Sequence, residues 1–176
     1  MTRSQLKPSS LIQIGLVIAA FLLTCCGTRA PSCPPIEMKN QAELPERVAV
    51  SAGCLVVRKQ QILLIKNNNG TISLPGGSAK KDEPANCTAH RETWEETGFD
   101  VTPLNRIRVN NNGFQLYSCA LDPNLTPTMI EKTRAPFRLE IRQTLWLSPT
   151  QFDQHSWRYP EIQLWLKQWL ATQKDL

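Results

Sequence analysis

The chain has 176 residues, with 20 Lys and Arg against 15 Asp and Glu, a formal net charge of +5 at pH 7 and a pI near 9.0. Apolar residues make up 41% and charged residues 20%, which excludes a disordered composition and supplies enough apolar side chains for a core. The length suits one domain and is too short for two ordinary domains with a linker. We find no repeat at a fixed period and no collagen or coiled-coil pattern.

The first 26 residues carry a targeting pattern. Arg3 and Lys7 precede an apolar run at residues 11–23, and no acidic residue occurs before Glu37. A short basic segment followed by about 7–15 apolar residues is typical of a secretory signal, whereas a membrane-spanning helix needs about 20 apolar residues. We therefore expect residues 1–26 to be a signal peptide or membrane anchor that places the rest of the chain outside the cytoplasm.

The end of this leader leaves three outcomes open. The sequence Leu-Leu-Thr-Cys-Cys resembles the lipobox of bacterial lipoproteins, which makes Cys25 or Cys26 a candidate for lipidation, although the residue before each is not the Gly or Ala that this class prefers. Cleavage to a soluble form, with residues 28–30 as a weak site, and retention as an uncleaved anchor are the alternatives. Residues 27–47, rich in proline, are then expected to be a linker.

The remaining residues, 48–176, are expected to form one domain of strands and helices. Apolar runs with β-branched residues predict strands, and two Asn-rich turns that end in glycine, 67–70 and 110–113, predict tight connections. The predicted strands are 48–58, 61–66, 72–74, 104–109, 114–121 and 138–147. With two helices, at 84–97 and 161–173, these strands predict a mixed α/β sandwich.

The sequence marks the ends of the first predicted helix and the buried face of the second. Pro84 near the first position, with Asp82 or Glu83 as a cap, and Gly98 after the end delimit the first helix. Apolar residues at helical spacing between Trp157 and Trp169 predict a core-facing stripe for the second helix. The two histidines, His90 and His155, lack a partner at ligand spacing and are expected at the surface.

Six cysteines are divided between the leader region and the domain. Cys54, Cys87 and Cys119 lie in the domain, and the other three lie at or before residue 33. In an oxidising compartment some could pair, but pairing cannot be deduced from a sequence. We expect the three domain cysteines to be small buried side chains, and no C-x-x-C spacing indicates a zinc site.

Three glutamates dominate the first helix. Glu92, Glu95 and Glu96 are spaced i, i+3 and i+4 and therefore share one face. Close carboxylates repel each other, and a hard divalent cation such as Mg²⁺ or Mn²⁺ would hold them together. Arg91 is placed to pair with Glu95 at i+4 or with Glu83 in the preceding loop. A solvated acidic face is the alternative, and three glutamates alone would favour it.

The spacing around these glutamates decides between the two interpretations. Residues 77–99 follow G-x5-E-x7-R-E-U-x-E-E-x-G-U, with U apolar, and resemble the signature of the Nudix hydrolase family. All seven fixed residues match, and the first U is occupied by Thr93. The segments Ile-Ser-Leu-Pro-Gly-Gly at 72–77 and Leu-Trp-Leu-Ser-Pro at 145–149 are similar to the family's W-x-L-P-G-G element and its last strand. We call residues 77–99 the box, and Glu92, Glu95 and Glu96 the box glutamates.

The resemblance implies a fold, an activity and site roles. It implies an α/β (α+β) Nudix-like fold with a mixed β-sheet between helices, and hydrolysis of a nucleoside diphosphate linked to another moiety with Mg²⁺ or Mn²⁺. The box glutamates become metal-site carboxylates, and Glu92 is also a candidate base for the attacking water. The Gly76 carbonyl becomes a further ligand, Arg91 orients a glutamate, and Glu83 supports the loop.

Residues outside the box extend this candidate site. Some family members use another glutamate from a late loop or strand, for which Glu140 is the first choice and Glu131 the second; a surface carboxylate is the alternative for both. Lys66, Lys80 and Lys81 lie beside the predicted site and are candidates for phosphate binding, with solvated side chains as the alternative.

Two other functions compete with a hydrolase. One is a non-catalytic nucleotide-binding module that keeps the fold, against which the complete set of box carboxylates argues. The other is a nucleic-acid binder, suggested by the pI. From residue 25 onward the chain has 18 basic and 15 acidic residues, and residues 82–100 hold six of the acids and one base. The charge thus forms an acidic patch in a basic body, without a Lys/Arg stripe, so no nucleic-acid partner is expected.

Overall fold

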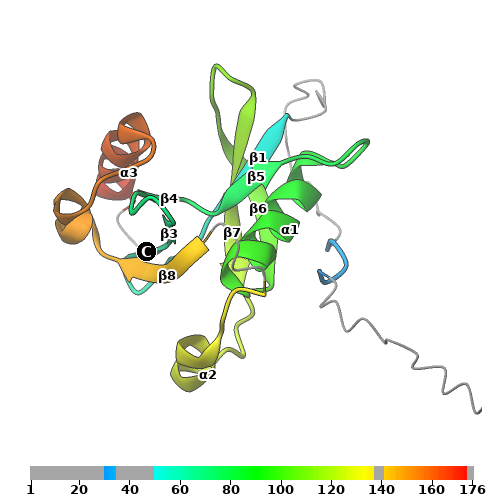
Figure 1. Cartoon of the computed structure of the whole chain (residues 1–176), viewed down its shortest axis with the longest axis horizontal. Helices are drawn as coiled ribbons and strands as arrows, with labels where there is room; N and C mark the ends of the chain where they lie inside the picture. The colour runs from blue at the N-terminus through cyan, green and yellow to red at the C-terminus, as the bar shows by residue number, and fades with distance from the viewer. Residues whose placement is uncertain (1–29, 35–49, 137–140, 174–176) are drawn as a thin grey trace, which may run out of the picture.

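The computed structural model describes residues 30–34, 50–136 and 141–173, drawn in colour in Figure 1. The predicted leader and most of the predicted linker lie outside these ranges. Within them, no helix is both long and apolar enough to cross a membrane.

The described ranges contain strands and helices in the mixed order expected from the sequence. The strands are β1 (Ser51–Leu55), β2 (Val57–Arg58), β3 (Gln61–Asn67), β4 (Ile72–Ser73), β5 (Gly76–Ser78), β6 (Val101–Val109), β7 (Phe114–Leu121) and β8 (Ile141–Leu147). The helices are α1 (Ala85–Thr97), α2 (Pro127–Lys132), the 3₁₀ helix η1 (Pro149–Gln154) and α3 (Pro160–Thr172).

The first sheet is mixed and has the strand order β5-β1-β7-β6. Strands β1 and β7 run parallel, with Ser51 opposite Phe114, and the outer pairs are antiparallel. Strands β6 and β7 form a hairpin because the intervening Asn-rich turn closes on Gly113, whose φ of 84° suits a residue without Cβ. In this register Ser51 of β1 lies between Phe114 at the start of β7 and Ser78 at the end of β5.

The second sheet is built around β3. Strand β3 pairs antiparallel with β2 and β4, and along its length with β8. Its residues 62–65, Ile-Leu-Leu-Ile, are all buried. A continuous apolar run of this kind, without alternation, is typical of a strand that is covered on both faces.

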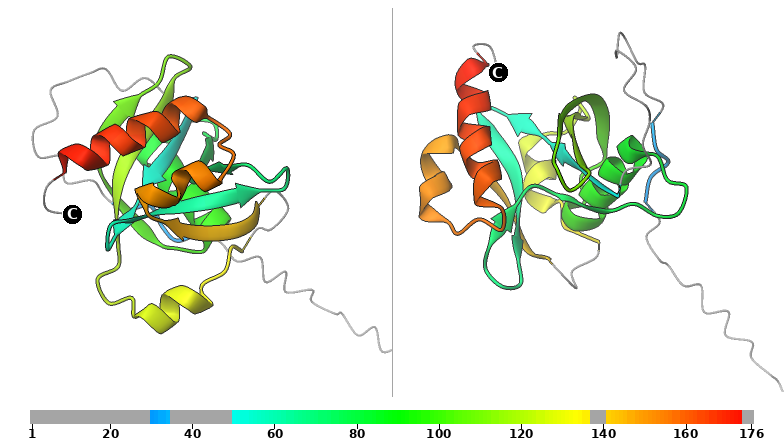
Figure 2. Two further views of the ribbon diagram at one scale, coloured as in Figure 1. Left: turned by 90° about the vertical axis from the view of Figure 1, so that its left-hand side faces the viewer. Right: turned by 90° about the horizontal axis from the view of Figure 1, so that it is seen from above.

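Helices cover the sheets from opposite sides (Figure 2). Helix α1 packs on the first sheet, where a core cluster includes Ala52, Cys54, Val56, Leu63, Ala89, Phe99 and Val101. Helix α3 and η1 close a second cluster, which includes Leu55, Ile62, Leu64, Ile72, Phe152, Trp157, Ile162 and Leu166. The expected mixed α+β fold and the core stripe of the last helix are confirmed.

Three local features differ from the sequence prediction. The predicted strand 48–58 is divided between β1 and β2, which belong to different sheets. Residues 76–78 form an additional strand, β5, in which the absence of a Cβ at Gly76 lets the backbone lie against Ala52 and Gly53 of β1. The short helix α2 was not expected, because residues 127–132 lack an apolar face that could be recognised, and none of them is buried.

The cysteines form disulfides rather than buried thiols. Cys54 pairs with Cys119 and Cys33 pairs with Cys87, so the expectation for the three domain cysteines is wrong. Residues 54 and 119 are 65 positions apart, and the parallel pairing of β1 with β7 brings them together. The second disulfide joins residues 30–34 to α1.

The expectation for His90 is also wrong. Its side chain is 1% exposed, and its Nε2 lies 2.8 Å from Oδ1 of Asp100. The residue lies on α1, on a face that packs inward, and the Asp100 carboxylate satisfies its polar end. His155, by contrast, is partly exposed.

Candidate active site

A residue of the box, rather than a side-chain cap, positions the loop at the start of α1. Pro84 is the N-cap residue and no side chain caps the helix, so the expected caps are wrong. Glu83 instead accepts hydrogen bonds from the Lys80 backbone N–H at 2.9 Å and the Thr88 hydroxyl at 3.0 Å. These bonds fold the loop before α1 back onto the helix.

Thr93 is the one box residue that departs from the apolar pattern, and a hydrogen bond within α1 satisfies its buried hydroxyl. Thr93 is fully buried, and its hydroxyl donates a 2.7 Å hydrogen bond to the Ala89 carbonyl one turn earlier. With the hydroxyl satisfied, the methyl group remains for packing of α1. The helix then ends at Gly98, whose φ of 80° lies in the left-handed region.

Arg91 is the centre of the box. Its side chain is 9% exposed. Nε and Nη2 donate to the two carboxylate oxygens of Glu83, both at 2.8 Å, and Nη2 also donates to the Ser78 carbonyl at 2.9 Å. Nη1 donates to Glu92 Oε1 at 2.6 Å and to Glu95 Oε2 at 3.0 Å. Both ion pairs considered from the sequence are therefore present.

These contacts and burial together shift the pKa values of Glu83, Arg91 and Glu92. The hydrogen bonds from Arg91 lower the pKa of Glu83 to about 2, against the opposing effect of burial. The hydrogen bond to Glu83 likewise raises the pKa of Arg91, which stays charged. Burial raises the pKa of Glu92 above its usual range, and Arg91 only partly offsets this.

The glycine pair before the helix sets how close the loop comes to the glutamates. The Gly76 N–H donates a 2.8 Å hydrogen bond to Glu96 Oε2. A Cβ at Gly76 would overlap the Ala52 carbonyl of β1, and a Cβ at Gly77 would overlap the Glu92 carboxylate. The loop backbone therefore lies directly against the face of α1 that carries the box glutamates.

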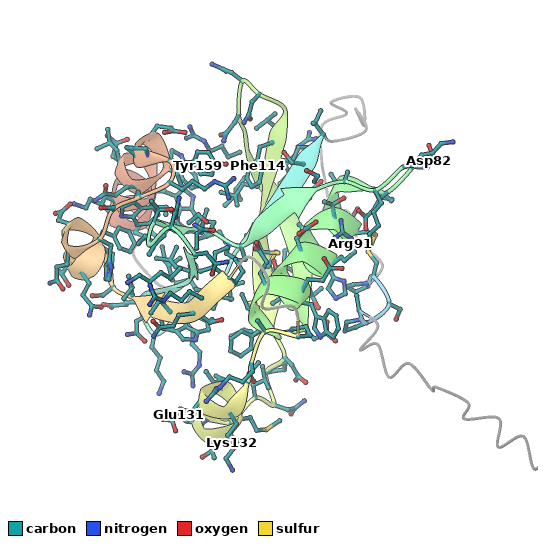
Figure 3. The ribbon with its side chains drawn as sticks, in the orientation of Figure 1. Asp82, Arg91, Phe114, Glu131, Lys132 and Tyr159 are labelled. Atoms are coloured by element: carbon teal, nitrogen blue, oxygen red, sulfur yellow. A yellow bond between two sulfur atoms is a disulfide. The ribbon has the colours of Figure 1, made fainter. Side chains whose placement is uncertain are left out.

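The box glutamates face a pocket of about 640 Å³. One end, which we call the acidic end, consists of Gly76, Gly77 and the three box glutamates. Further parts of the lining come from the β6–β7 turn, the start of β7 and the segment before α3. These parts include Asn110, Asn112, Phe114, Trp157, Arg158 and Tyr159, and Figure 3 shows Phe114 and Tyr159 apart from Arg91 and the loop at Asp82.

The acidic end fits a hard divalent cation. Its donors are carboxylate and carbonyl oxygens, and Arg91 uses one oxygen each of Glu92 and Glu95. Among the described residues, no three Asp, Glu, His or Cys side chains converge closely enough to enclose an ion by themselves. Mg²⁺ is commonly held by one or two carboxylates together with water and substrate phosphates, so this donor set agrees with its chemistry.

The other predicted residues lie at different distances from the pocket. None of Lys66, Lys80 and Lys81 is among its lining residues, although Lys80 Nζ lies 3.8 Å from Oε1 of Glu95, which does line it. Glu131 lies on α2 against a second pocket, away from the box (Figure 3). Glu140 lies outside the described residues, and the next residue, Ile141, lines the pocket.

Sequence reasoning missed the part of the pocket lining that comes from the β6–β7 turn and the segment before α3. Asn110 and Asn112 signalled only a turn, and Trp157 was attributed to the core, in which it is indeed buried. Arg158 and Tyr159 carried no signal, because nothing in the sequence relates the segment before the last helix to the box.

Comparison with known proteins identifies the family. The model described as NUDIX domain matches residues 47–166. The chain belongs to the Nudix family. A stretch of 64 residues is 41% identical to a MutT-like protein of Streptomyces ambofaciens. The match covers 35% of this chain and 42% of that protein, so the chain spans less than half the length of this relative.

Solved structures share the Nudix fold with this chain. An ADP-ribose pyrophosphatase from Streptococcus suis aligns with a TM-score of 0.55 and 20% identity, over 72% of this chain and 94% of that one. A NUDIX-family hydrolase from Clostridium perfringens aligns with a TM-score of 0.56 and 16% identity, over 72% and 98%. At these identities the comparison establishes the fold.

The Nudix box predicts a pH-dependent loss of stability when Glu83 is replaced. A carboxylate whose pKa is lowered on folding stabilises the folded state above its ordinary pKa of about 4.5 and loses this effect as the pH falls towards 2. We expect Glu83→Gln to lower the free energy of unfolding by about 2–3 kcal/mol at pH 7. The difference from wild type should vanish near pH 2.

Urea unfolding followed by circular dichroism at pH 7, 4.5 and 2.5 measures this difference. The exposed Glu131, replaced by Gln, is the matched control and should unfold like wild type at each pH. A gap for Glu83→Gln that stays constant over the three pH values would contradict the ion pair with Arg91.

Proposed function

We propose that the chain is a divalent-metal-dependent hydrolase that cleaves the diphosphate bond of a nucleoside diphosphate linked to another moiety. The observation that carries this proposal is the pocket in which the box glutamates and Gly76 face one cavity of about 640 Å³, a size typical of small-molecule sites. Membership of the Nudix family and the fold shared with an ADP-ribose pyrophosphatase support the same class of reaction.

The residues of the acidic end suit attack of water on a diphosphate. A bound Mg²⁺ or Mn²⁺ would neutralise the diphosphate and make a water molecule more acidic. Glu92 is the proposed base: Arg91 holds its Oε1, which leaves Oε2 to accept the proton from water. Glu95 and Glu96 are the further carboxylates proposed to hold the metal, together with the Gly76 carbonyl.

Arg91 and Glu83 act on this chemistry indirectly. Arg91 contacts Glu92 and Glu95 at once and therefore sets the spacing of two carboxylates. Glu83 anchors Arg91 through two hydrogen bonds. Glu140 remains the proposed additional glutamate, since it is adjacent in sequence to Ile141 of the pocket lining. Lys80 is the proposed phosphate contact, because its Nζ lies 3.8 Å from Glu95 Oε1.

The central test is metal-dependent turnover that depends on the box glutamates. With a panel of nucleoside diphosphate derivatives, we expect Mg²⁺- or Mn²⁺-dependent release of phosphate or a nucleoside monophosphate, abolished by EDTA. Glu92→Gln and Glu96→Gln should each reduce kcat by at least about 100-fold, because they remove a proton acceptor or a charge from the reacting centre. Glu131→Gln, on α2, should retain wild-type activity.

A different result would favour the alternative function. Tight, saturable nucleotide binding with no turnover above the level of the Glu92→Gln variant would indicate a non-catalytic module that keeps the Nudix fold. Absence of both binding and turnover across the panel would contradict both functions.

The two glycines offer a matched pair that separates catalysis from folding. The three atoms nearest to an alanine methyl at Gly77 all belong to the Glu92 carboxylate, at the far end of a flexible side chain, so Gly77→Ala should displace that carboxylate without moving the backbone. At Gly76 the methyl meets the backbone of β1. We expect Gly77→Ala to lower kcat by about 10-fold or more with a melting temperature near that of wild type, and Gly76→Ala to lower the melting temperature.

Thermal unfolding and steady-state kinetics on the two variants provide the comparison. A Gly77→Ala variant with the kcat and melting temperature of wild type would show that turnover does not depend on the position of the Glu92 carboxylate. That result would contradict the proposed role of Glu92 as base.

We further propose that residues 1–26 direct export, that residues 27–47 are a linker, and that the domain acts outside the cytoplasm. The basic, acid-free leader supports this, and so do the disulfides Cys33–Cys87 and Cys54–Cys119, because disulfides persist mainly in oxidising compartments. A lipid on Cys25 or Cys26 is the proposed means of membrane attachment.

Thiol labelling and mass spectrometry of the protein from producing cells test this proposal. We expect the cysteines of both disulfides to react with maleimide only after reduction, and the chain to begin at or near Cys25, with or without an added lipid mass. Reactive thiols at all four positions, together with an intact residue 1 in the cytoplasmic fraction, would contradict export.

A further inference from the structure

The two disulfides differ in how accessible their sulfur atoms are. Cys54 is fully buried and Cys119 is 6% exposed, and both belong to a core cluster. Cys33 and Cys87 are both partly exposed, and within the described ranges neither core cluster contains them. Thiol–disulfide exchange requires that the attacking thiolate reaches a sulfur atom. A reductant in solution can therefore reach Cys33–Cys87 more easily than the core disulfide.

The partly exposed disulfide fastens residues 30–34 to the helix that carries the box glutamates. Cys87 lies in the first turn of α1. Figures 1 and 2 show residues 30–34, drawn in blue, beside this helix and away from α3. Asn86 Nδ2 also donates a 3.7 Å hydrogen bond to Cys33 Sγ. Since no core cluster of the described residues includes this segment, its position against the domain depends on the covalent bond.

The same disulfide shortens the chain that joins the domain to the proposed attachment at Cys25 or Cys26. While the bond is closed, the path from residue 26 to the domain runs through residues 27–32 and spans at most about 25 Å. Once the bond opens, the path to β1 runs through residues 27–50 and can span about 85 Å. The redox state of this bond therefore sets how far the active site can lie from its attachment.

We propose that Cys33–Cys87 is a site of thiol–disulfide exchange with a dithiol reductant, and that its opening lengthens the chain that attaches the domain while Cys54–Cys119 stays closed. The exchange follows from the partial exposure of Cys33 and Cys87 and from their position outside the core. The change of length rests in addition on the proposed attachment at Cys25 or Cys26.

The exchange uses both thiols of the reductant. One thiolate attacks Cys33 Sγ, the bond between Cys33 and Cys87 breaks, and its electron pair passes to Cys87 Sγ, which then takes a proton. Cys87 is the favoured leaving thiolate because the N-terminus of a helix stabilises negative charge. The second thiol of the reductant displaces Cys33, which is protonated in turn. The protein gains two electrons and two protons, and the reductant becomes a disulfide.

Differential alkylation of the full chain from producing cells measures the exchange. Graded dithiothreitol is added, free thiols are blocked with N-ethylmaleimide, and the remaining disulfides are reduced and labelled with iodoacetamide for mass spectrometry. We expect Cys33 and Cys87 to be half reduced at a dithiothreitol concentration at least about 10-fold below that needed for Cys54 and Cys119. In concentrated urea the two disulfides should open within about 3-fold of each other, because unfolding makes both accessible.

Cleavage on the domain side of Cys33 measures the change of attachment. A glutamate-specific protease can cut after Glu37, Glu43 or Glu46, and no acidic residue precedes them. On isolated membranes, we expect the cut domain to stay attached while Cys33–Cys87 is closed and to be released by the dithiothreitol concentration that opens it. The double variant Cys33→Ser, Cys87→Ser should be released without reductant. A variant with glutamine at all three sites is the matched control and should stay attached even after reduction.

The exchange is overturned if both disulfides open at the same dithiothreitol concentration, if Cys54–Cys119 opens first, or if Cys33 and Cys87 react with maleimide before reduction. The change of length is overturned if the uncut chain is soluble, or if the cut domain stays on the membrane after Cys33–Cys87 has opened. None of these measurements uses turnover, so a failed hydrolase assay would reject the proposed function and leave this inference standing.

Discussion

A single buried cation determines the geometry of the box. Arg91 is almost fully buried and donates to three carboxylates and a carbonyl, from both the loop and its own helix. A buried charge without partners is strongly destabilising, so these contacts must form together with the fold. The loop position, the spacing of Glu92 and Glu95 and the charged state of Glu83 all depend on this one side chain.

The same constraint explains why close carboxylates are tolerated on one helix face. Arg91 neutralises part of their repulsion in the folded protein, and Glu96 is engaged by the Gly76 N–H. Arg91 and the Gly76 N–H therefore hold the box glutamates in position along one cavity. Such preorganisation reduces the rearrangement that binding and reaction require.

The acidic end and the rest of the pocket lining have different origins in the chain, and this decides how far each could be predicted. The acidic end depends on Gly76 and on residues of the 23-residue box that follows it, and the spacing of these residues in the sequence predicts that they act together. Phe114 and Tyr159 are 45 positions apart and meet only because the sheets and α3 bring them to one cavity. Long-range packing of this kind leaves no periodic signal in a single sequence.

The disulfide pairing could not be predicted from the sequence for the same reason. The burial of the cysteines was foreseen in part, but pairing requires Cα atoms within about 7 Å, a condition set by strand register rather than by spacing along the chain. The parallel alignment of β1 with β7 supplies that register for Cys54 and Cys119. The division of the first predicted strand into β1 and β2 has the same cause, because each half pairs with a different partner.

By itself, the sequence determined the identity of the box, the helix that carries it, the pairing options of Arg91 and the mixed α+β class. These properties follow from local spacing, which sets which side chains share a helix face and which positions need glycine. Only the tertiary structure decided the disulfides, the position of His90, the placement of Glu131 against a second pocket, and the part of the pocket lining that comes from β7 and the segment before α3. Each of these depends on which distant segments pack together, and that is settled by the burial of the whole core rather than by any one stretch of residues.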